Sequence, residues 1–359
     1  MKLLIHAING IGLGHLIRTS RIAESFEKLR DDSEIVFVTN SRYSQILEKD
    51  HKTYALRKDT RDVIEGKCTY DEYLKFNTRA ISKIIFHERP DAVLFDCELN
   101  RELVVLCRRN SIKCIFVLRV PAPERFSEIK SDLALFDGVV VPHHEDEMPS
   151  EQRNFLRKLG AVFAGPIVDT FTCSANTERK NILITFGSGA NIPDNLPLFS
   201  AVDSFLNFLR ESNSSIDGQR INLDIVTGPF YDGGCDLGGF AVRTTSDSLA
   251  KDMCQAKIVI SGAGYNTINE IISTKTPAVV VPLRRKWDDQ FRRAEFYDRL
   301  GCLKICSKEI LEDIRNVLDN WQGFHDRFPL IHNGNRKAAE AVIAVCNSKT
   351  NLNSLSKNK

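Results

Sequence analysis

The chain has 359 residues, of which 42% are hydrophobic and 27% are charged, and its formal net charge is only +2. A chain of this length normally forms two domains, and its small net charge gives no reason to expect nucleic acid as a partner. The sequence has no run of ~20 apolar residues that could span a membrane, and its short apolar start lacks the long core of a signal peptide. We therefore expect a cytoplasmic protein.

In the first half, short apolar runs alternate with amphipathic segments. The short runs are apolar on both faces, which is typical of buried parallel strands. Expected strands are 3–8, 35–39, 92–95, 114–118, 138–141 and 161–164, and expected helices are 16–29, 70–87 and 101–109.

The second half repeats this alternation. Its expected strands are 181–186, 223–227, 241–243, 258–260 and 278–281, and its expected helices are 196–210, 246–254, 267–273, 288–300, 308–321 and 335–345. The pattern predicts an α/β protein with two doubly wound, Rossmann-like domains that face each other across a cleft.

The domain boundary is expected within 165–180, where Gly165 and Pro166 end a strand and a stretch rich in Thr, Ser and Asn follows. This divides the chain into an N-terminal domain, 1–165, and a C-terminal domain, 166–347. The final helix, 335–345, is expected to pack back on the first domain. The polar tail, 348–359, is expected to be disordered.

A glycine-rich loop with Gly10, Gly12 and Gly14 follows the first strand and leads into His15. It satisfies only part of a dinucleotide-binding motif, because His15 stands where the third glycine belongs and no acidic residue ends the second strand. A histidine at a helix N-terminus tends to stay neutral, which suits a general base. The alternative is a histidine that only caps or packs the helix.

Asp96 ends a predicted strand, so its carboxylate is expected in the same cleft, where it would orient His15. The alternative role is a helix N-cap. Glu98 is a second candidate for the same task, and His6 is expected to be a core residue. His143 and His144 resemble metal ligands but have no third partner at convincing spacing, so we expect them to be solvated or to face a partner.

Two further glycine loops follow strands of the second half, Gly187-Ser188-Gly189 and Gly262-Ala263-Gly264. Free backbone N–H groups at the start of a helix form a phosphate site, and the alternative is a pair of tight turns. Glu270 lies too deep in the helix after the second loop to cap it, and it could accept hydrogen bonds from the hydroxyls of a ribose. Arg284, Arg285 and Lys286 could neutralise phosphate or form a solvated face.

The ten cysteines form no CxxC pair, and several lie in apolar runs, such as Cys114 and Cys254. This favours buried thiols in a reducing compartment over disulfides or zinc ligands.

The order of these motifs resembles the GT-B glycosyltransferases, most closely the family 28 enzymes that include the lipid II-forming N-acetylglucosaminyltransferase. The resemblance implies a UDP-sugar in the C-terminal domain, with Glu270 on the ribose, Gln290 on the sugar and Ser188 near the diphosphate. It also places His15 beside the acceptor. The donor-binding residues expected on this basis are Gly12, Gly14, Gly187, Ser188, Gly189, Gly262, Ala263, Gly264, Asn266, Thr267, Glu270, Asp289 and Gln290.

Two departures from the family pattern bear on function. The family usually has two glutamines where this chain has Asp289 and Gln290, and an Asp-Gln pair is common in relatives that use other nucleotide sugars. The sequence Gly14-His15-x-x-Arg18 is also similar to a nucleotide-sugar hydrolase of pseudaminic acid biosynthesis, in which water replaces the acceptor.

The sequence therefore predicts an inverting glycosyltransferase that needs no metal or other cofactor, with His15 and Asp96 as catalytic residues and UDP-GlcNAc as the favoured donor. The alternatives are a nucleotide-sugar hydrolase and a non-catalytic nucleotide-sugar-binding subunit. The acceptor is expected to be a hydroxyl of a lipid-linked or small molecule. Segment 73–86 is basic and amphipathic, so it either docks at the inner face of a membrane or is a core helix with a solvated face.

Overall fold

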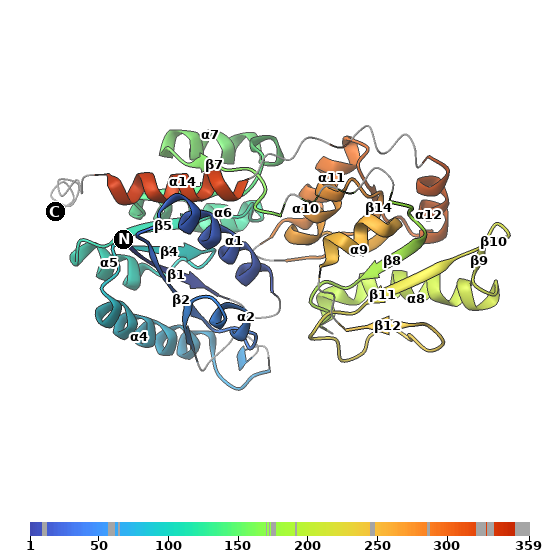
Figure 1. The fold of residues 1–359 in the computed structure, drawn as a ribbon, viewed down its shortest axis with the longest axis horizontal. Helices are drawn as coiled ribbons and strands as arrows, with labels where there is room; N and C mark the ends of the chain where they lie inside the picture. Colours follow the sequence, from blue (N-terminus) through green and yellow to red (C-terminus); the bar gives the residue numbers. More distant parts are fainter. Residues whose placement is uncertain are drawn as a thin grey trace.

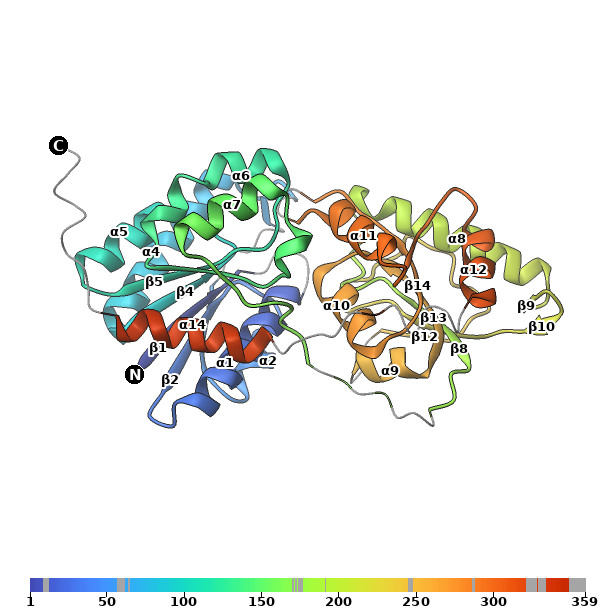
Figure 2. The ribbon, with the colours of Figure 1, turned by 90° about the horizontal axis from the view of Figure 1, so that it is seen from above.

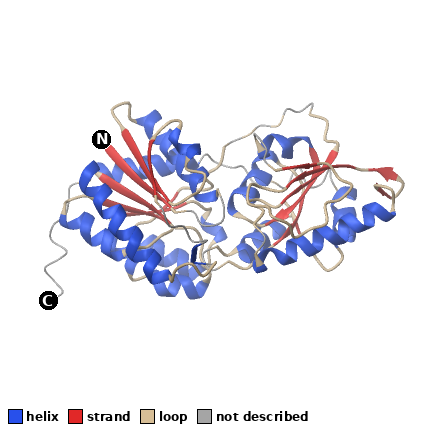
Figure 3. Cartoon of the chain, turned by 90° about the horizontal axis from the view of Figure 1, so that it is seen from below, coloured by secondary structure: helices blue, strands red, loops and turns tan. Residues whose placement is uncertain are grey.

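The computed structural model of the chain describes residues 1–8, 13–56, 62–63, 65–169, 171, 173, 177–190, 192–244, 248–285, 288–320, 328 and 334–348. They form two α/β lobes, and in each a parallel sheet lies between layers of helices (Figures 1 and 3). The predicted fold class, two doubly wound domains, is confirmed.

The N-terminal sheet has seven parallel strands in the order β3-β2-β1-β4-β5-β6-β7. The strand order reverses between β1 and β4, and ligands of such sheets bind where this happens, beyond the carboxyl ends of the strands. The strands are β1 (Lys2–Ala7), β2 (Glu34–Thr39), β3 (Lys52–Ala55), β4 (Ala92–Asp96), β5 (Lys113–Val117), β6 (Gly138–Val141) and β7 (Val162–Phe163).

The C-terminal sheet has six parallel strands in the order β12-β11-β8-β13-β14-β15, and its order reverses between β8 and β13. Two of the predicted glycine loops follow these two strands. The strands are β8 (Asn181–Thr185), β11 (Asn222–Val226), β12 (Val242–Arg243), β13 (Ala256–Gly262), β14 (Ala278–Val281) and β15 (Lys304–Ile305), and a small hairpin is formed by β9 (Ser215–Ile216) and β10 (Gln219–Arg220).

Helices cover both faces of each sheet. Those of the first half are α1 (Gly14–Leu29), α2 (Gln45–Glu48), α4 (Tyr70–Glu88), α5 (Arg101–Arg109), α6 (Pro123–Ile129), α7 (Ser150–Leu159) and the 3₁₀ turns η1 (Asp132–Leu135) and η2 (Glu145–Glu147). Those of the second half are η3 (Pro193–Asn195), α8 (Leu196–Glu211), α9 (Leu249–Gln255), α10 (Tyr265–Thr274), α11 (Gln290–Arg299), α12 (Ile310–Asp319) and α14 (Gly334–Asn347).

The strands are apolar on both faces because each sheet is buried on both sides. In β4, Val93 and Phe95 join one hydrophobic cluster of the N-terminal lobe, whereas Ala92 and Leu94 join the other. This arrangement explains the lack of period-2 alternation in the sequence.

The final helix, α14, belongs to the N-terminal lobe in space. It packs against α1 and the β5–β6 side of the N-terminal sheet, where Ala338, Ala339 and Val342 are fully buried (Figure 2). The described part of the chain therefore begins and ends in the same lobe.

Several features differ from the sequence expectations, which did not include helices α2, α6 and α7 or the hairpin of β9 and β10. The short strands β3 and β15 were not expected, since neither contains an apolar run. The expectation that all cysteines are thiols is wrong, because Cys173 and Cys254 form a disulfide with a Cα–Cα distance of 5.5 Å. Cys173 lies against Cys254 of α9, 81 residues along the chain, which the spacing of the cysteines could not reveal.

We expect Val342→Asp to lower the free energy of unfolding of the N-terminal lobe by about 3 kcal/mol or more, since it buries an unpaired charge between α14 and that lobe. Urea unfolding followed by circular dichroism measures the loss. The control is Glu340→Ala in the same helix, whose exposed ion pair with Arg336 predicts a change within about 0.5 kcal/mol. Equal stability of the two variants would show that α14 is not part of this core.

Candidate functional site

His15 and Asp96 meet at the reversal point of the N-terminal sheet. Asp96 is the last residue of β4, paired in register with Ala7 of β1, and His15 lies in the first turn of the helix that follows β1. The His15 Nδ1 to Asp96 Oδ2 distance is 2.8 Å. Nδ1 therefore donates its proton to the carboxylate, and Nε2 is the nitrogen left to accept one.

Arg18 completes this cluster, and the sequence reasoning had not included it among the site residues. Its guanidinium is fully buried and donates to Asp96 from Nε (3.1 Å to Oδ1) and from Nη2 (2.8 Å to Oδ1 and 2.7 Å to Oδ2). The Gly-His-x-x-Arg spacing was a signal, since residues three apart share a helix face.

The electrostatics of the cluster favour a charged Asp96 and a neutral His15. Although burial opposes ionisation, Arg18 and His15 hold the pKa of the Asp96 carboxyl well below its ordinary value. Burial lowers the pKa of His15, which Asp96 partly offsets and which Arg119 and Arg18 reinforce. His15 can therefore accept a proton at neutral pH.

Cys97 adds a third group with metal-ligand chemistry, but the cluster does not suit a cation. Ligand atoms of His15, Asp96 and Cys97 all lie within 4.8 Å of one another. However, Arg18 Nη2 lies 3.6 Å from Cys97 Sγ and occupies both Asp96 oxygens, so a metal ion would meet a fixed positive charge. Cys97 also has a φ of 63°, a strained backbone of the kind found at functional sites.

The glycine loop after β8 packs closely against the segment that follows β11. Gly187 and Gly189 have φ values of 64° and 78°, and a Cβ on Gly189 would lie 2.1 Å from the carbonyl oxygen of Thr227. Only glycine fits there. Ser188 stands between them, and its carbonyl accepts from Phe230 N at 2.9 Å.

The loop after β13 leads into α10 at the reversal point of the C-terminal sheet. Gly264 is the N-cap residue of α10, and the buried Ala263 carbonyl accepts from Arg293 at 2.9 Å. Gly262 ends β13. Asn266 faces the N-terminal lobe, since a Cβ on Gly14 would lie 3.6 Å from Asn266 Nδ2.

Glu270 lies in α10 and contacts Arg21 of α1 across the lobes. Arg21 Nη2 is 3.5 Å from Glu270 Oε1 and 2.9 Å from Asp169 Oδ2, and the Glu270 side chain is 13% exposed. Burial raises the pKa of the Glu270 carboxyl from 4.5 to about 6, although Arg21 opposes this. Thr267 lies one turn before Glu270, on the side of Gly264.

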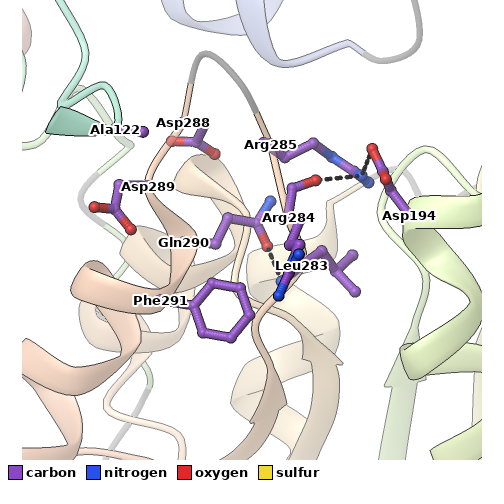
Figure 4. A pocket seen from close by; sticks show the side chains of 9 residues that line it. All are labelled: Ala122, Asp194, Leu283, Arg284, Arg285, Asp288, Asp289, Gln290 and Phe291. Atoms are coloured by element: carbon purple, nitrogen blue, oxygen red, sulfur yellow. Dashed lines mark hydrogen bonds and ion pairs between the residues drawn. The ribbon is translucent and has the colours of Figure 1, made fainter. Parts of the chain in front are cut away.

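Asp289 and Gln290 line a cavity of ≈ 520 Å³ between β14 and α11 (Figure 4). Gln290 Oε1 accepts from Leu283 N at 3.1 Å, which orients the amide, and Asp289 caps α11 by accepting from Arg292 N at 3.1 Å. The cavity is lined by Ala122, Asp194, Leu283, Arg284, Arg285, Asp288, Asp289, Gln290 and Phe291.

Asp288 also belongs to this cavity and was missed from the sequence. It is buried and paired with Arg293, and its Oδ2 lies 3.7 Å from Arg119 of the N-terminal lobe. Although burial opposes ionisation, Arg293 and Arg119 hold the pKa of Asp288 well below its ordinary value. On the other side, Arg285 pairs with Asp194 at 3.1 Å.

Two histidine expectations have different outcomes. His6 is buried as expected, and Glu98 contacts it at 3.5 Å, so Glu98 is a partner of His6 rather than a substitute for Asp96. The expectation that His143 is solvated is wrong. It is 1% exposed, its Nδ1 donates to Glu147 at 2.7 Å, and its Nε2 accepts from Val120 N at 3.3 Å. Gly10, Gly12 and Lys286 lie outside the described residues.

Comparisons with known proteins relate part of this sequence to a family and the whole structure to a fold. Residues 206–342 match the model of the glycosyltransferase family 28 C-terminal domain. The resemblance to family 28 is confirmed for the C-terminal domain. A relative from Pelagibacter ubique, the UDP-N-acetylglucosamine–N-acetylmuramyl-(pentapeptide) pyrophosphoryl-undecaprenol N-acetylglucosamine transferase, is 26% identical over 188 residues, 48% of this chain and 50% of that protein. The alignment thus spans about half of that relative's length.

Solved structures match almost the whole chain and show the fold. MurG of Acinetobacter baumannii aligns with 96% of this chain and 99% of its own, with a TM-score of 0.62 and 17% identity. The fold is GT-B. The UDP-GlcNAc 2-epimerase of Neisseria meningitidis shares it, with a TM-score of 0.64 and 13% identity over 96% of this chain and 99% of its own. The fold therefore does not distinguish a transferase from an epimerase.

Within the part of the chain that the structure describes, no helix is both long enough and apolar enough to cross a membrane.

We expect Glu270→Gln to stabilise the protein at pH 8 by up to about 2 kcal/mol and to leave it unchanged near pH 4. The native pKa of about 6 exceeds the ordinary 4.5, so the native state binds more protons in this window, and the contribution of Glu270 to stability falls as pH rises through it. Urea unfolding at both pH values measures this, with Glu295→Gln on exposed α11 surface as the control. A variant less stable than wild type at pH 8 would contradict the expectation.

Proposed function

We propose that the chain is an inverting, metal-independent glycosyltransferase that takes its sugar from a UDP-sugar, with UDP-GlcNAc as the favoured donor. The observation that carries the proposal is the His15–Asp96 pair at the reversal point of one sheet, with glycine loops at the reversal point of the other. The family 28 match and the relatives, named as N-acetylglucosamine transferases, support the reaction and the donor.

In the proposed reaction, His15 Nε2 takes the proton of an acceptor hydroxyl as its oxygen attacks the anomeric carbon of the donor. The bond between that carbon and the diphosphate oxygen breaks, and UDP leaves from the opposite face with the electron pair. The attack therefore inverts the anomeric configuration. Asp96 stabilises the imidazolium that forms.

The leaving diphosphate is stabilised at the loop 262–264, where the N-terminus of α10 supplies backbone N–H groups and its dipole. The loop 187–189 lies at the facing strand end, but the N–H groups of Gly187 and Gly189 already donate to Thr185 Oγ1 and to the Phe186 carbonyl. Glu270 accepts hydrogen bonds from the ribose hydroxyls, and Gln290 contacts the sugar beside the ≈ 520 Å³ cavity. Arg18 supports a mechanism without a metal ion, because its fixed positive charge lies among His15, Asp96 and Cys97, the residues that could otherwise bind a metal.

One observation favours a second candidate, a nucleotide-sugar hydrolase. Arg18 completes the Gly-His-x-x-Arg sequence that resembles a hydrolase. It binds Asp96 and therefore lies in the same cluster as His15, the proposed base. In a hydrolase, His15 would deprotonate water instead of an acceptor hydroxyl. Free sugar and UDP formed without acceptor, at a rate comparable to transfer, would favour this candidate.

We expect His15→Ala to lower kcat by roughly 10²–10⁴-fold while UDP affinity stays within about threefold, since the base contributes only after binding. UDP release from UDP-GlcNAc measures kcat, NMR of the product gives its anomeric configuration, and calorimetry gives the affinity for UDP. The control is His87→Ala, an exposed histidine of α4. A product of retained configuration would exclude the inverting mechanism, and UDP binding with no turnover, unchanged by His15→Ala, would indicate a non-catalytic subunit.

We further propose that α4 docks on an anionic membrane that carries a lipid-linked acceptor. Its buried face contains Tyr73, Asn77, Ile81 and Ile85. The opposite face is exposed and combines aromatic with basic side chains within an arc of about 100° at 3.6 residues per turn: Lys75, Phe76, Arg79, Lys83 and Phe86. One acidic residue, Glu72, lies in the same arc at the N-terminal end of the helix, where it accepts from Thr69 N. Aromatic side chains with Lys and Arg around them are typical of interfacial helices.

We expect the triple change Lys75→Gln, Arg79→Gln and Lys83→Gln to weaken binding to phosphatidylglycerol-containing vesicles by on the order of 100-fold, at about 1 kcal/mol per basic residue. Co-sedimentation measures the binding. A matched control changes three exposed lysines of the C-terminal lobe, Lys251, Lys257 and Lys308, to Gln. Equal losses in the two triple variants, or no binding by wild type, would contradict the role of α4.

A further inference from the structure

Arg18 is buried together with Asp96, and the carboxylate of Asp96 makes its shortest hydrogen bonds. Its guanidinium and the Asp96 carboxylate are both 0% exposed, and three donor–acceptor contacts of 2.7–3.1 Å join them. Nη1 of Arg18 is buried without a hydrogen-bond partner. Besides Asp96, the guanidinium makes longer polar contacts within its own lobe, from Nη2 to His15 Nδ1 at 3.2 Å and to Cys97 Sγ at 3.6 Å, so its position also depends on the side chains that pack against it.

Tyr265, which comes from the C-terminal lobe, packs against the Arg18 guanidinium. Tyr265 is the first residue of α10, and its ring centroid lies 5.3 Å from Arg18 Cζ, within the range of a cation–π contact. The same ring lies 5.6 Å from Arg293 Cζ. Tyr265 thus stands between one cation of the N-terminal lobe and one of the C-terminal lobe.

The ring cannot easily move, because both functions of its hydroxyl are used. The Tyr265 hydroxyl donates to the Pro142 carbonyl at 2.8 Å and accepts from Ile167 N at 2.8 Å. Pro142 follows β6, and Ile167 belongs to the connection that leaves the N-terminal sheet. His143 packs edge-on against the ring at 5.0 Å between centroids.

Beyond Tyr265 the contacts lead to the donor side of the cleft. Arg293 donates to Ala263 of the glycine loop and pairs with Asp288, which lines the cavity beside Gln290. The Tyr265 ring therefore contacts both Arg18, which binds the Asp96 carboxylate, and Arg293, which binds the glycine loop on the donor side.

On these contacts, we propose that Arg18 and Tyr265 are positioning residues for His15. Arg18 holds Asp96 in the orientation that fixes the His15 ring, and Tyr265 holds Arg18 from the C-terminal lobe. The base is thus fully assembled only when the two lobes are docked. The proposal rests on the proposed function in one respect, the role of His15 as the base.

Arg18 also sets the charge of the cluster. With His15 neutral, Arg18 and Asp96 cancel, and protonation of His15 leaves a net charge of +1. The charged groups that act on His15 are Asp96 at the end of β4, which favours its protonation, and Arg119 after β5 and Arg18 of α1, which oppose it. Cys97 also lies within 4.8 Å of the cluster, and burial raises the pKa of its thiol. Removal of Arg18 should therefore raise the pKa of His15.

The test compares Arg18→Met, which removes the charge, with Arg18→Lys, which keeps it. We expect Arg18→Met to lower the maximal kcat by about tenfold or more and to move the acid limb of the kcat–pH profile to higher pH. Arg18→Lys should keep the acid limb of wild type and recover part of kcat. UDP affinity should stay within about threefold in both. Arg157→Met, on the exposed surface of α7, is the control with unchanged activity.

Tyr265 is tested with the ring kept or removed. Tyr265→Phe loses the two hydrogen bonds but keeps the contact with Arg18, whereas Tyr265→Leu loses both. We expect a loss of kcat of about tenfold in Tyr265→Leu and a clearly smaller loss in Tyr265→Phe. Equal losses in the two variants, in proportion to their loss of thermal stability, would reduce Tyr265 to a structural contact and overturn its part of the proposal.

A measurement without turnover separates this proposal from the proposed function. ¹⁵N NMR of the His15 ring in the whole protein should show a proton on Nδ1 and titration below the ordinary histidine value, with titration at higher pH in Arg18→Met. If Arg18→Met does not fold, Asp96→Asn is compared with the double variant Arg18→Met/Asp96→Asn, and His15 should titrate at higher pH in the double variant because only that variant lacks the Arg18 charge. Identical titration in wild type, Arg18→Lys and Arg18→Met would overturn the role of Arg18. Full turnover by His15→Ala would instead refute the base assignment while leaving the NMR result valid.

Discussion

The Asp96 carboxylate is completely buried and ionised, and this constraint organises the surrounding structure. A buried charge must be paired and hydrogen-bonded, or it destabilises the fold. Asp96 meets this requirement with Arg18 and His15, both from α1, so the pairing also fixes the first turns of α1 against the end of β4. The requirement that stabilises the buried acid therefore also orients the imidazole.

The same logic extends across the cleft. Arg18 brings a second charge into the interior, and Tyr265 covers it from the C-terminal lobe. Arg21, one turn further along α1, reaches Glu270 of α10. Two arginines on one face of α1 thus meet two residues of α10, and these polar contacts between the lobes lie beside the proposed reaction centre. Polar contacts between domains are compatible with relative movement.

Much of this could be predicted from the sequence, because strand and loop positions follow from local patterns. Short segments that are apolar on both faces predicted the parallel sheets, and the glycine loops after strands predicted the edges of the sheets that face the cleft. His15 and Asp96 were expected to meet because each follows a strand that ends at that edge. Arg18 and Tyr265 could not be placed in the same way, since a helical arginine is usually solvated and an aromatic residue at a helix start usually joins a core. Their roles depend on how the two lobes dock, which no local pattern encodes. The buried His143 and the pairing of Cys173 depend on long-range folding for the same reason.

The return of α14 to the N-terminal lobe affects how the two lobes are connected and whether they can be exchanged. Since the chain crosses from one lobe to the other and back, two backbone connections rather than one join the C-terminal lobe to the N-terminal lobe. Two covalent connections restrict the relative movement of the lobes more than a single connection would. A single cut cannot separate intact lobes either. A chimaera that exchanges the donor half with that of another protein needs two junctions, one after β7 and one before α14.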